Sequence, residues 1–248
     1  MWDEILLYVA VGFAAQMIDG AIGMAYGVTA SSVLLSAGVS PVTASACVHA
    51  AEVFTTGASG LAHWRLGNID QRLVVSLMVP GMIGGAIGAY VLTSLPGEAL
   101  RPWVSAYLLL LGLVILWKAF RSVPRQAAPP KGVVPLGFFG GLVDAVGGGG
   151  WGPLVTSTLL GSGGAPRTVI GSVNIAEFFV TLTISATFVA TVGLSLWPIV
   201  LGLVIGGVIA APFAALTTKH LPDRVLMVIV GGVVVGLSCR NFLKALGY

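Results

Sequence analysis

Long apolar stretches alternate with short polar stretches along the whole chain, and this pattern predicts helices that cross a membrane. A spanning helix needs about 20 predominantly apolar residues. Eight apolar segments are present, over approximately 6–35, 45–62, 73–92, 103–120, 133–160, 169–194, 198–217 and 225–242. Six of them have the length of one crossing. The first and the fifth, at roughly 30 residues each, are too long for one ordinary crossing.

The composition sets the class of protein. Hydrophobic residues make up 56% of the 248 residues and charged residues 8%, and the mean hydropathy is +0.99. A soluble domain has about 25% charged residues, so we expect an all-α polytopic membrane protein whose first partner is the lipid bilayer. The net charge of +3 is too small and too scattered to indicate nucleic-acid binding. Cys47 and Cys239 lack metal-binding spacing, and we predict neither a metal site nor a cofactor.

The two long segments begin an internal repeat. When the chain is shifted by 125 positions, residues 12–56 align with 137–181 without a gap, and 16 of the 45 positions are identical. The matched pairs are Asp19/Asp144, Gly23/Gly148, Gly27/Gly152, Pro41/Pro166 and Glu52/Glu177. The repeat predicts two homologous halves, 1–120 and 133–248. They are joined by a basic, Pro-rich linker at 121–132, which the positive-inside rule places in the cytoplasm.

Two topologies fit this repeat. If every apolar segment crosses once, each half crosses four times and the halves are parallel. If the long first segment of each half enters the membrane and returns, each half crosses three times and the halves are inverted. Arg65 and Arg72 flank a loop whose repeat partner, around Trp197, carries no charge. Matching loops of different charge favour inversion, and inverted repeats with broken helices are a recurrent transporter design.

Four of the nine acidic residues lie inside apolar segments, where they form the pairs Asp19/Asp144 and Glu52/Glu177. An Asp at the centre of a spanning helix costs about 2.5–3.5 kcal/mol, so four such acids are not expected by chance. We predict that all four take part in ion coupling. The alternative is that they are protonated, or that they cap broken helices by accepting backbone N–H bonds. For the aspartates both interpretations stay open; for the glutamates ion coupling or binding is favoured.

The glycine clusters "DGAIGMAYG" and "DAVGGGGWG" predict a break in each long segment. A helix that restarts near Val28 or Pro153 would direct its N-terminal N–H groups at a cavity, which is a binding site for an anion. The alternative is that the glycines only permit close helix packing and that the hydroxyls bond back to helix carbonyls. The candidate substrate-binding residues are Gly23, Gly27, Ser31, Ser32, Gly148, Gly149, Gly150, Trp151, Gly152, Thr156, Ser157 and Asn174.

His49 and Asn174 occupy matching positions, each three residues before a glutamate. Residues three apart share one face of a helix, so each pair presents two polar groups together. His49 is a candidate proton carrier near neutral pH; a hydrogen-bonded structural histidine is the alternative. The predicted ion-coupling set is Asp19, His49, Glu52, Asp144 and Glu177.

The segments "GFAAQMIDGAIGMAYGVTASSVLL" and "GFFGGLVDAVGGGGWGPLVTSTLL" resemble the sulfite exporter TauE/SafE family. The resemblance implies a multi-pass protein of a prokaryotic cell (inner) membrane that moves sulfite or related organosulfur anions. The second-half motif matches well, whereas "GAIGMAYG" has fewer glycines and carries Val28 where the second half carries Pro153.

The chain has no Walker A motif, so a gradient must supply the energy for transport. We therefore predict a secondary transporter, not an enzyme. It would export sulfite or an organosulfur or carboxylate anion, coupled to H⁺ or Na⁺. Two alternatives remain: an intramembrane aspartyl protease with Asp19 and Asp144 as its catalytic pair, and a passive anion channel.

Overall fold

The computed structural model describes residues 2–22, 24–120, 132–162, 164–193, 197–217 and 223–246, and these ranges are helical with no strand among them. The first half contains α1 (Trp2–Ile22), α2 (Tyr26–Ser36), α3 (Pro41–Arg65), α4 (Gln71–Ser94) and α5 (Gly97–Ala119). The second half contains α6 (Val133–Gly147), the short π-helix η1 (Gly152–Thr156), α7 (Ser157–Gly161), α8 (Pro166–Val192), α9 (Trp197–Thr217) and α10 (Asp223–Ala245). The all-α architecture is as predicted.

Within the described residues, four helices are long and apolar enough to cross a membrane: Gln71–Ser94, Ala99–Ala119, Arg167–Val192 and Met227–Ala245. The sequence pattern predicted six single crossings, so four of the six are supported by described helices. α3 is long enough but carries His49 and Glu52, which lower its hydropathy. α9 contributes the shorter apolar stretch Trp197–Ala210. The two broken segments contribute the shorter apolar stretches Ile5–Asp19 and Val133–Gly147.

Both long segments are broken. Between α1 and α2 the chain turns at Ala25, which adopts a φ of +107° and is the non-glycine residue with positive φ in the described ranges. Between α6 and η1 the turn is made by Gly148 and Gly149, with φ values of +68° and +151°. Backbone of this kind suits glycine because it lacks a Cβ. The breaks therefore lie where the glycine clusters predicted them.

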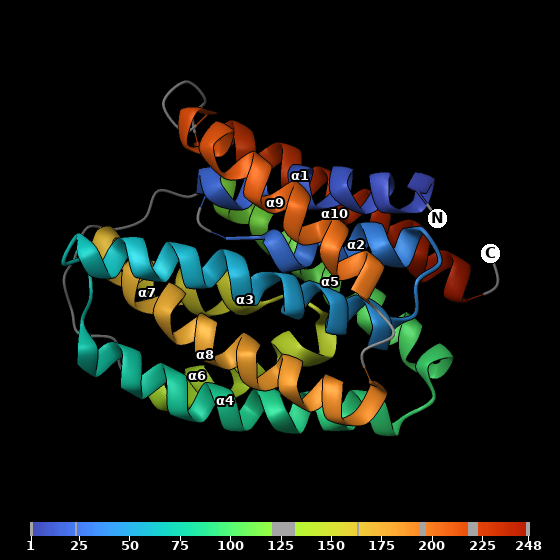
Figure 1. Ribbon diagram of the computed structural model, residues 1–248, viewed down its shortest axis with the longest axis horizontal. Coiled ribbons are helices and arrows are strands. Elements are labelled where there is room, and N and C mark those ends of the chain that lie inside the picture. Colours follow the sequence, from blue (N-terminus) through green and yellow to red (C-terminus); the bar gives the residue numbers. More distant parts are fainter. Residues whose placement is uncertain are drawn as a thin grey trace.

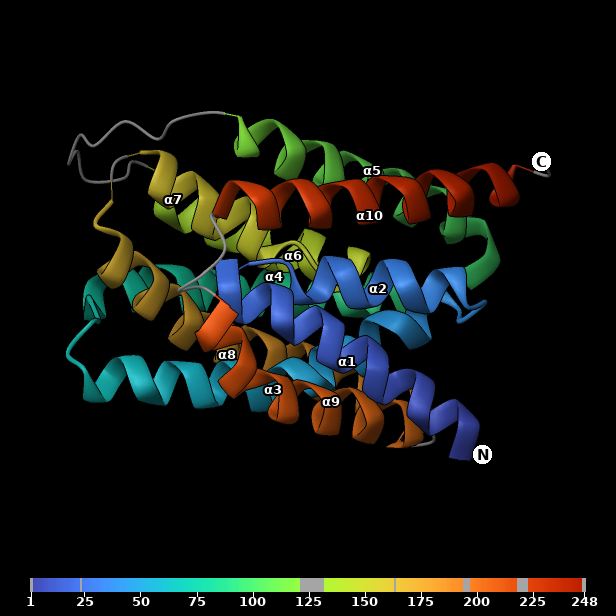
Figure 2. The ribbon, with the colours of Figure 1, turned by 90° about the horizontal axis from the view of Figure 1, so that it is seen from above.

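Each break reverses the direction of the chain (Figures 1 and 2). α1 runs inward from the N-terminus and α2 returns toward the same end, whereas α6 enters from the opposite end and η1 and α7 return to that end. The two broken segments therefore approach the middle of the molecule from opposite ends.

The two sequence halves interlock. α1 packs along α9, α6 along α4, α5 against α10 and α3 against α8, so each of these contacts joins one half to the other. Close approach depends on glycine: a Cβ on Gly137 would lie 2.7 Å from the Leu77 carbonyl oxygen, and one on Gly206 would lie 2.6 Å from the Phe13 nitrogen. Such small-residue packing is common between membrane helices. α1 corresponds to α6 in the repeat, and α9 corresponds to α4. The packing of α1 on α9 therefore matches the packing of α6 on α4.

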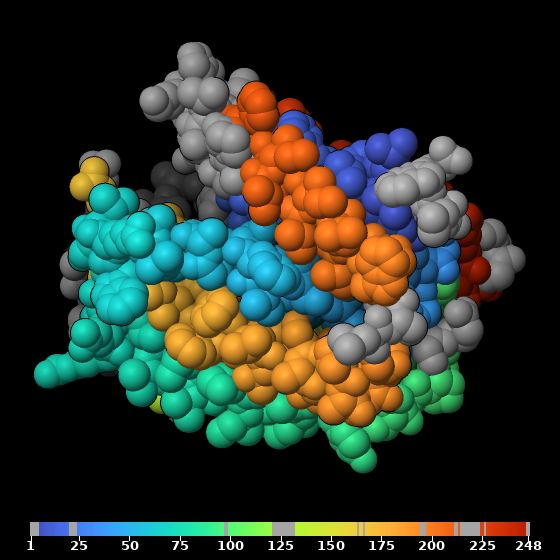
Figure 3. All heavy atoms as spheres, viewed as in Figure 1, coloured from blue at the N-terminus to red at the C-terminus, as the bar shows by residue number. Residues whose placement is uncertain are grey.

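Two hydrophobic cores result, and neither coincides with one half of the sequence. The first core joins α1, α2, the start of α3, α5, α9 and α10; the second joins α4, α6, α7 and α8. On the face seen in Figure 3, α3, α8 and α4 lie side by side. Their outward side chains include the exposed Phe54, Val75 and Phe179, as expected for a surface that contacts acyl chains.

Candidate functional site

The two breaks meet backbone to backbone at the centre of the molecule. A Cβ on Gly27, from the first repeat, would lie only 2.7 Å from the Cα of Gly149, from the second. Ser31 donates its hydroxyl to the carbonyl of Gly148, and Ser45 donates to the carbonyl of Ala145 at 2.6 Å. The last carbonyls of a helix have no partner within the helix, so hydroxyls of the first repeat complete the end of α6.

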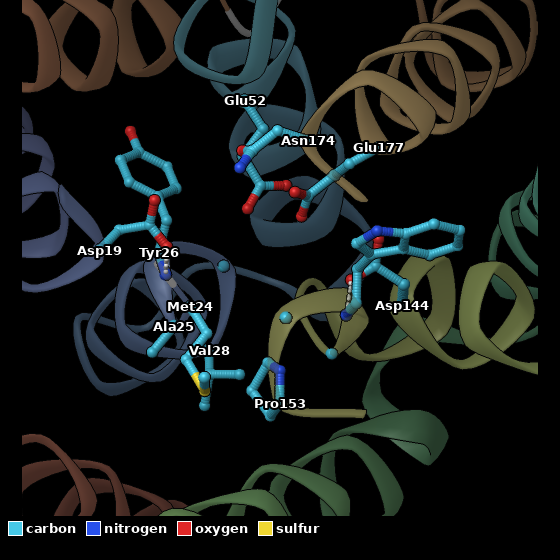
Figure 4. Close-up of a pocket in the computed structure, with 14 residues that line it drawn as sticks. Asp19, Met24, Ala25, Tyr26, Val28, Glu52, Asp144, Pro153, Asn174 and Glu177 are labelled. Carbon is cyan, nitrogen blue, oxygen red and sulfur yellow. Dashed lines mark hydrogen bonds between the residues drawn. The ribbon is translucent and has the colours of Figure 1, made fainter. Parts of the chain in front are cut away.

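Each aspartate caps the helix that follows its own break. The Tyr26 N–H donates to Asp19 Oδ1 at 3.2 Å, and the Trp151 N–H donates to Asp144 Oδ1 at 3.0 Å. Both bonds join residues seven apart and therefore occupy matching places in the repeat (Figure 4). A carboxylate at a helix N-terminus satisfies an N–H that has no acceptor within the helix, and it interacts favourably with the helix dipole. The geometry therefore agrees with the capping interpretation of Asp19 and Asp144.

Asp144 has a second contact, with His49 of α3. The His49 Nε2 lies 3.2 Å from Asp144 Oδ2, and both side chains are buried. The other ring nitrogen, Nδ1, lies 2.8 Å from the Ser45 carbonyl oxygen, which can only accept, so Nδ1 carries a hydrogen. A hydrogen bond between Nε2 and the carboxyl group then requires one further proton, on either His49 or Asp144. This pair spans the two repeats and can hold that proton.

The matching position in the second repeat behaves differently. Asn174 donates its amide to the Ile170 carbonyl at 2.9 Å, within its own helix. The polar pair at His49 therefore has no equivalent at Asn174, although the two residues align in the repeat. The site combines two similar breaks with unequal polar groups behind them.

A cavity of about 20 Å³ lies between the breaks, which is room for about one water molecule. Its lining residues come from both repeats: Asp19, Met24, Ala25, Tyr26, Gly27, Val28, Glu52, Asp144, Gly150, Trp151, Gly152, Pro153, Asn174 and Glu177. All four acids of the apolar segments are among them. Figure 4 shows Glu52 and Glu177 extending from α3 and α8 toward the same space.

Glu52 is a buried acid with an incomplete set of partners. Its Oε1 lies beside Gly27, the second residue of α2, at 2.9 Å from the position of a Cβ built on that glycine. Its Oε2 is buried and has no hydrogen-bond partner among the described residues. The indole Nε1 of Trp151 is a buried donor, and it has no acceptor among the described residues. An acceptor and a donor without partners thus belong to residues of the same cavity wall.

The structure brings together only part of the predicted site. Of the substrate-binding candidates, Gly27, Gly150, Trp151, Gly152 and Asn174 line the cavity, as do the ion-coupling candidates Asp19, Glu52, Asp144 and Glu177. His49 lies behind Asp144 and does not line the cavity. Gly23 lies outside the described residues.

The remaining candidates make structural contacts away from the cavity wall. Ser31, Gly148 and Gly149 form the crossing between the breaks. Ser32 lies 3.4 Å from Ser238 of α10, measured between the two hydroxyl oxygens. Ser157 bonds back toward Gly152 at 3.5 Å, and Thr156 is buried without lining the cavity. Of these hydroxyls, Ser157 makes the bond back to a carbonyl of its own helical stretch that the alternative predicted, whereas Ser31 and Ser32 contact other segments.

Several lining residues were not among the candidates: Met24, Ala25, Tyr26, Val28 and Pro153. The repeat contained a signal for Tyr26, because it aligns with Trp151 and both follow a break. Tyr26 is anchored by its hydroxyl, which donates to the Leu203 carbonyl of α9 at 3.4 Å. Ala25 aligns with Gly150, but its residue type gave no indication of a positive φ.

Comparisons with known proteins extend over nearly the whole chain. The family described as sulfite exporter TauE/SafE matches residues 8–241. The Probable membrane transporter protein YtnM of Bacillus subtilis (strain 168) is 41% identical over 250 residues, covering 97% of this chain and 83% of that protein. No solved structure matches the chain. Both matches include the two breaks and all four acids of the cavity.

Proposed function

The chain belongs to the sulfite exporter TauE/SafE family of membrane transporters, and we propose that it is a secondary transporter that exports a small anion. The proposed substrate is sulfite, an organosulfur anion or a carboxylate anion, and the proposed coupling ion is H⁺ or Na⁺. One observation carries the proposal: two helices, one from each repeat, begin at a single cavity that four buried or half-buried acids line.

Two features of the cavity support anion binding. The starts of α2 and of the helical stretch from Trp151 to Gly161 face it, and helix N-termini attract negative charge. The indole N–H of Trp151 is a further donor without a partner in the described structure. The proposed substrate contacts are therefore the N–H groups near Gly27 and Gly152 together with the Trp151 indole.

The acids support coupling to a cation. Asp19, Glu52, Asp144 and Glu177 would repel an anion if all four were ionised. Protons or Na⁺ bound by these groups would remove that repulsion, so binding of the anion and of the coupling ion would favour one another. His49 belongs to the same set through its contact with Asp144.

We propose further that α1–α2 and α6–α7 are re-entrant hairpins that enter from opposite sides of the membrane. The halves 1–120 and 133–248 would then have inverted topology with three crossings each. The directions of the helices support this arrangement (Figure 2). The linker 121–132 lies outside the described residues except for its last position.

Charge supports the orientation. At one end of the molecule the described helices carry the five basic residues Arg65, Arg72, Lys118, Arg167 and Arg224. At the other end they carry three, Arg101, Arg240 and Lys244. The positive-inside rule assigns the first end, where the linker is attached, to the cytoplasm. The proposed location is the cell inner membrane.

The protease alternative is not supported. An aspartyl protease needs its two carboxyl groups to act together on one peptide bond. Here Asp19 and Asp144 each accept a backbone N–H from their own repeat, and the family and the relative are transporters.

Flux measurements test the proposal. Purified protein in proteoliposomes loaded with sulfite should show saturable efflux that an H⁺ or Na⁺ gradient directed out of the vesicles stimulates, because the cation and the anion favour each other's binding. Glu177→Gln should reduce that stimulation by about tenfold, the usual size of coupling between two sites. Asp70→Asn is the matched control, because it removes a carboxylate from an exposed helix cap while asparagine still caps well. Non-saturating, gradient-independent flux would indicate a passive channel instead.

A further inference from the structure

The N-terminus of α2 is already occupied by carboxylates of the protein itself. The N–H of Tyr26 donates to Asp19, and Oε1 of Glu52 lies beside Gly27, 2.9 Å from the position of a Cβ built on that glycine. α2 is a helix of 11 residues, and Tyr26 and Gly27 are its first two. An anion that binds at this terminus therefore meets one acid that holds the first donor and a second acid that lies beside the next.

The two acids are not equivalent. The Asp19 contact is repeated at Asp144 and Trp151, as expected for a structural cap that duplication preserved. Among the described residues, the contact of Glu52 with Gly27 is not repeated between Glu177 and Gly152, because the atoms nearest to a Cβ built on Gly152 belong to Met24 and Ala25. Glu52 reaches α2 from a different helix, α3, and can leave without unwinding the break.

Glu52 is also poorly satisfied for a buried acid. Its side chain is 5% exposed, and its Oε2 has no partner in the described part of the chain. A buried carboxylate oxygen without a hydrogen bond costs free energy. The residue lines the cavity and its carboxyl group points into it (Figure 4). This oxygen therefore marks a position that a ligand or a proton completes.

We infer that the Glu52 carboxylate is an internal anion that competes with the transported anion for the N–H groups at the start of α2. A proton from the solvent forms an O–H bond on Glu52. The neutral carboxyl group no longer repels an anion beside Gly27, and an oxygen of the substrate then accepts the Gly27 N–H. One proton is bound for each anion admitted. The inference rests on the proposed function, because it names how the anion gains access to that site.

The charges around Glu52 favour this exchange. The groups that face it are Asp19 from α1, Tyr26 from α2, Asp144 from α6 and Glu177 from α8, and His49 of α3 lies beyond Asp144. None of these four facing side chains is a cation. The ammonium of Lys118 instead donates to the Pro153 carbonyl at 3.0 Å. A substrate anion at the start of α2 therefore gains from neutralisation of Glu52, the acid that lies beside Gly27.

The size of the cavity leads to the same conclusion. Its volume of about 20 Å³ accommodates one water molecule, and an oxyanion with three or four oxygen atoms is larger. Movement of the Glu52 side chain away from Gly27 would free a donor and enlarge the cavity in one step. Space and charge thus change together when Glu52 is protonated.

Binding measurements on the purified full chain test the inference. Methanesulfonate is a suitable probe because its charge is constant over the working range, and the fluorescence of Trp151 or a thermal shift reports its binding. For the wild type, the apparent Kd should fall by up to tenfold for each pH unit between about pH 8 and pH 5.5, as one linked proton requires. Glu52→Gln should abolish that dependence and bind at the higher pH as tightly as the wild type does at the lower.

Three comparisons decide the outcome. Glu177→Gln should shift the pH at which binding strengthens without removing the slope, since Glu177 does not compete for Gly27. Asp70→Asn should reproduce the wild type. Glu52→Ala, which removes the competing group altogether, should also bind without pH dependence and serves if the glutamine variant does not fold.

Wild-type slope retained in Glu52→Gln would overturn the inference and leave anion transport standing. No binding by the wild type or by either Glu52 variant would overturn both. Binding by the Glu52 variants alone would support the inference, because it would show that the carboxylate excludes the anion.

Discussion

The two broken segments are built on one plan and differ in the groups around it. In each, an aspartate accepts the N–H of an aromatic residue seven positions later, and the chain then continues as a helix. The first break turns at an alanine with φ +107°, whereas the second turns at glycines. His49 supports Asp144, while its repeat partner Asn174 bonds within its own helix. The two repeats thus share the caps and differ at His49 and Asn174.

This difference indicates a division of roles. A cap must satisfy a backbone N–H in any conformation of a broken helix, so both copies need one. Groups that exchange a proton or a ligand are needed only where that exchange occurs. Glu52 and His49, both on α3, are among the described groups whose contacts the second repeat does not reproduce. We therefore expect the first repeat's α3 to contribute more to coupling than α8.

The largest expected effect comes from adding one methyl group at the crossing of the breaks. Gly149→Ala places a Cβ 2.7 Å from the Cα of Gly27, at a φ of +151°. Backbone on the other side cannot yield, and we expect a loss of about 3–5 kcal/mol in stability. Thermal unfolding in detergent measures it. Gly161→Ala is the control, because nothing lies within 4 Å of its added Cβ, and a change within about 0.5 kcal/mol is expected.

If Gly149→Ala proved as stable as Gly161→Ala, the two breaks would not be in backbone contact. The contrast with the first break is informative, since that break tolerates an alanine at positive φ in the native sequence. Whether a break tolerates alanine therefore depends on the space beside the turn as well as on the φ angle.

Removal of the two aspartate caps should lower the stability by different but smaller amounts in the two repeats. Asp19→Ala loses one helix cap, worth about 0.5–2 kcal/mol. Asp144→Ala loses the equivalent cap and also leaves the buried His49 Nε2 without its partner, which adds about 1–3 kcal/mol. The apparent melting temperature should therefore fall further for Asp144→Ala.

Asparagine variants provide the control for this comparison, because asparagine can accept the same backbone N–H. Asp19→Asn and Asp144→Asn should both retain more stability than the alanine variants. Equal losses for Asp19→Ala and Asp144→Ala would mean that the His49 contact adds nothing to the second break.

The smallest expected effect is at Ala25. Its positive φ is strained for a residue with a Cβ, and Ala25→Gly should relieve that strain. Glycine also increases the entropy of the unfolded chain, so the net gain should be at most about 1 kcal/mol. A rise in melting temperature for Ala25→Gly would confirm the strain, and a fall would show that the buried methyl group contributes more by packing.

The sequence by itself determined the class of protein, the positions of both breaks and the pairing of the acids. These are local properties: hydropathy fixes which segments are helices in a bilayer, and runs of glycine fix where a helix stops. The alignment of Asp19 with Asp144 also identified the two residues that became matching caps. Their choice between capping and coupling could not be read from the chain, because both roles need a carboxylate beside a break.

Only the tertiary structure decided which groups meet. Ser31 with Gly148, Ser45 with Ala145 and His49 with Asp144 are contacts between residues about 100 positions apart, brought together by the interlocked halves. A rotation of α3 by one residue would direct other side chains at the cavity, with no change in the hydrophobic pattern that predicted the helix. The same packing turned Ser32 toward α10 and left Glu52 against Gly27. The helices follow from local chemistry, and the site follows from how they pack.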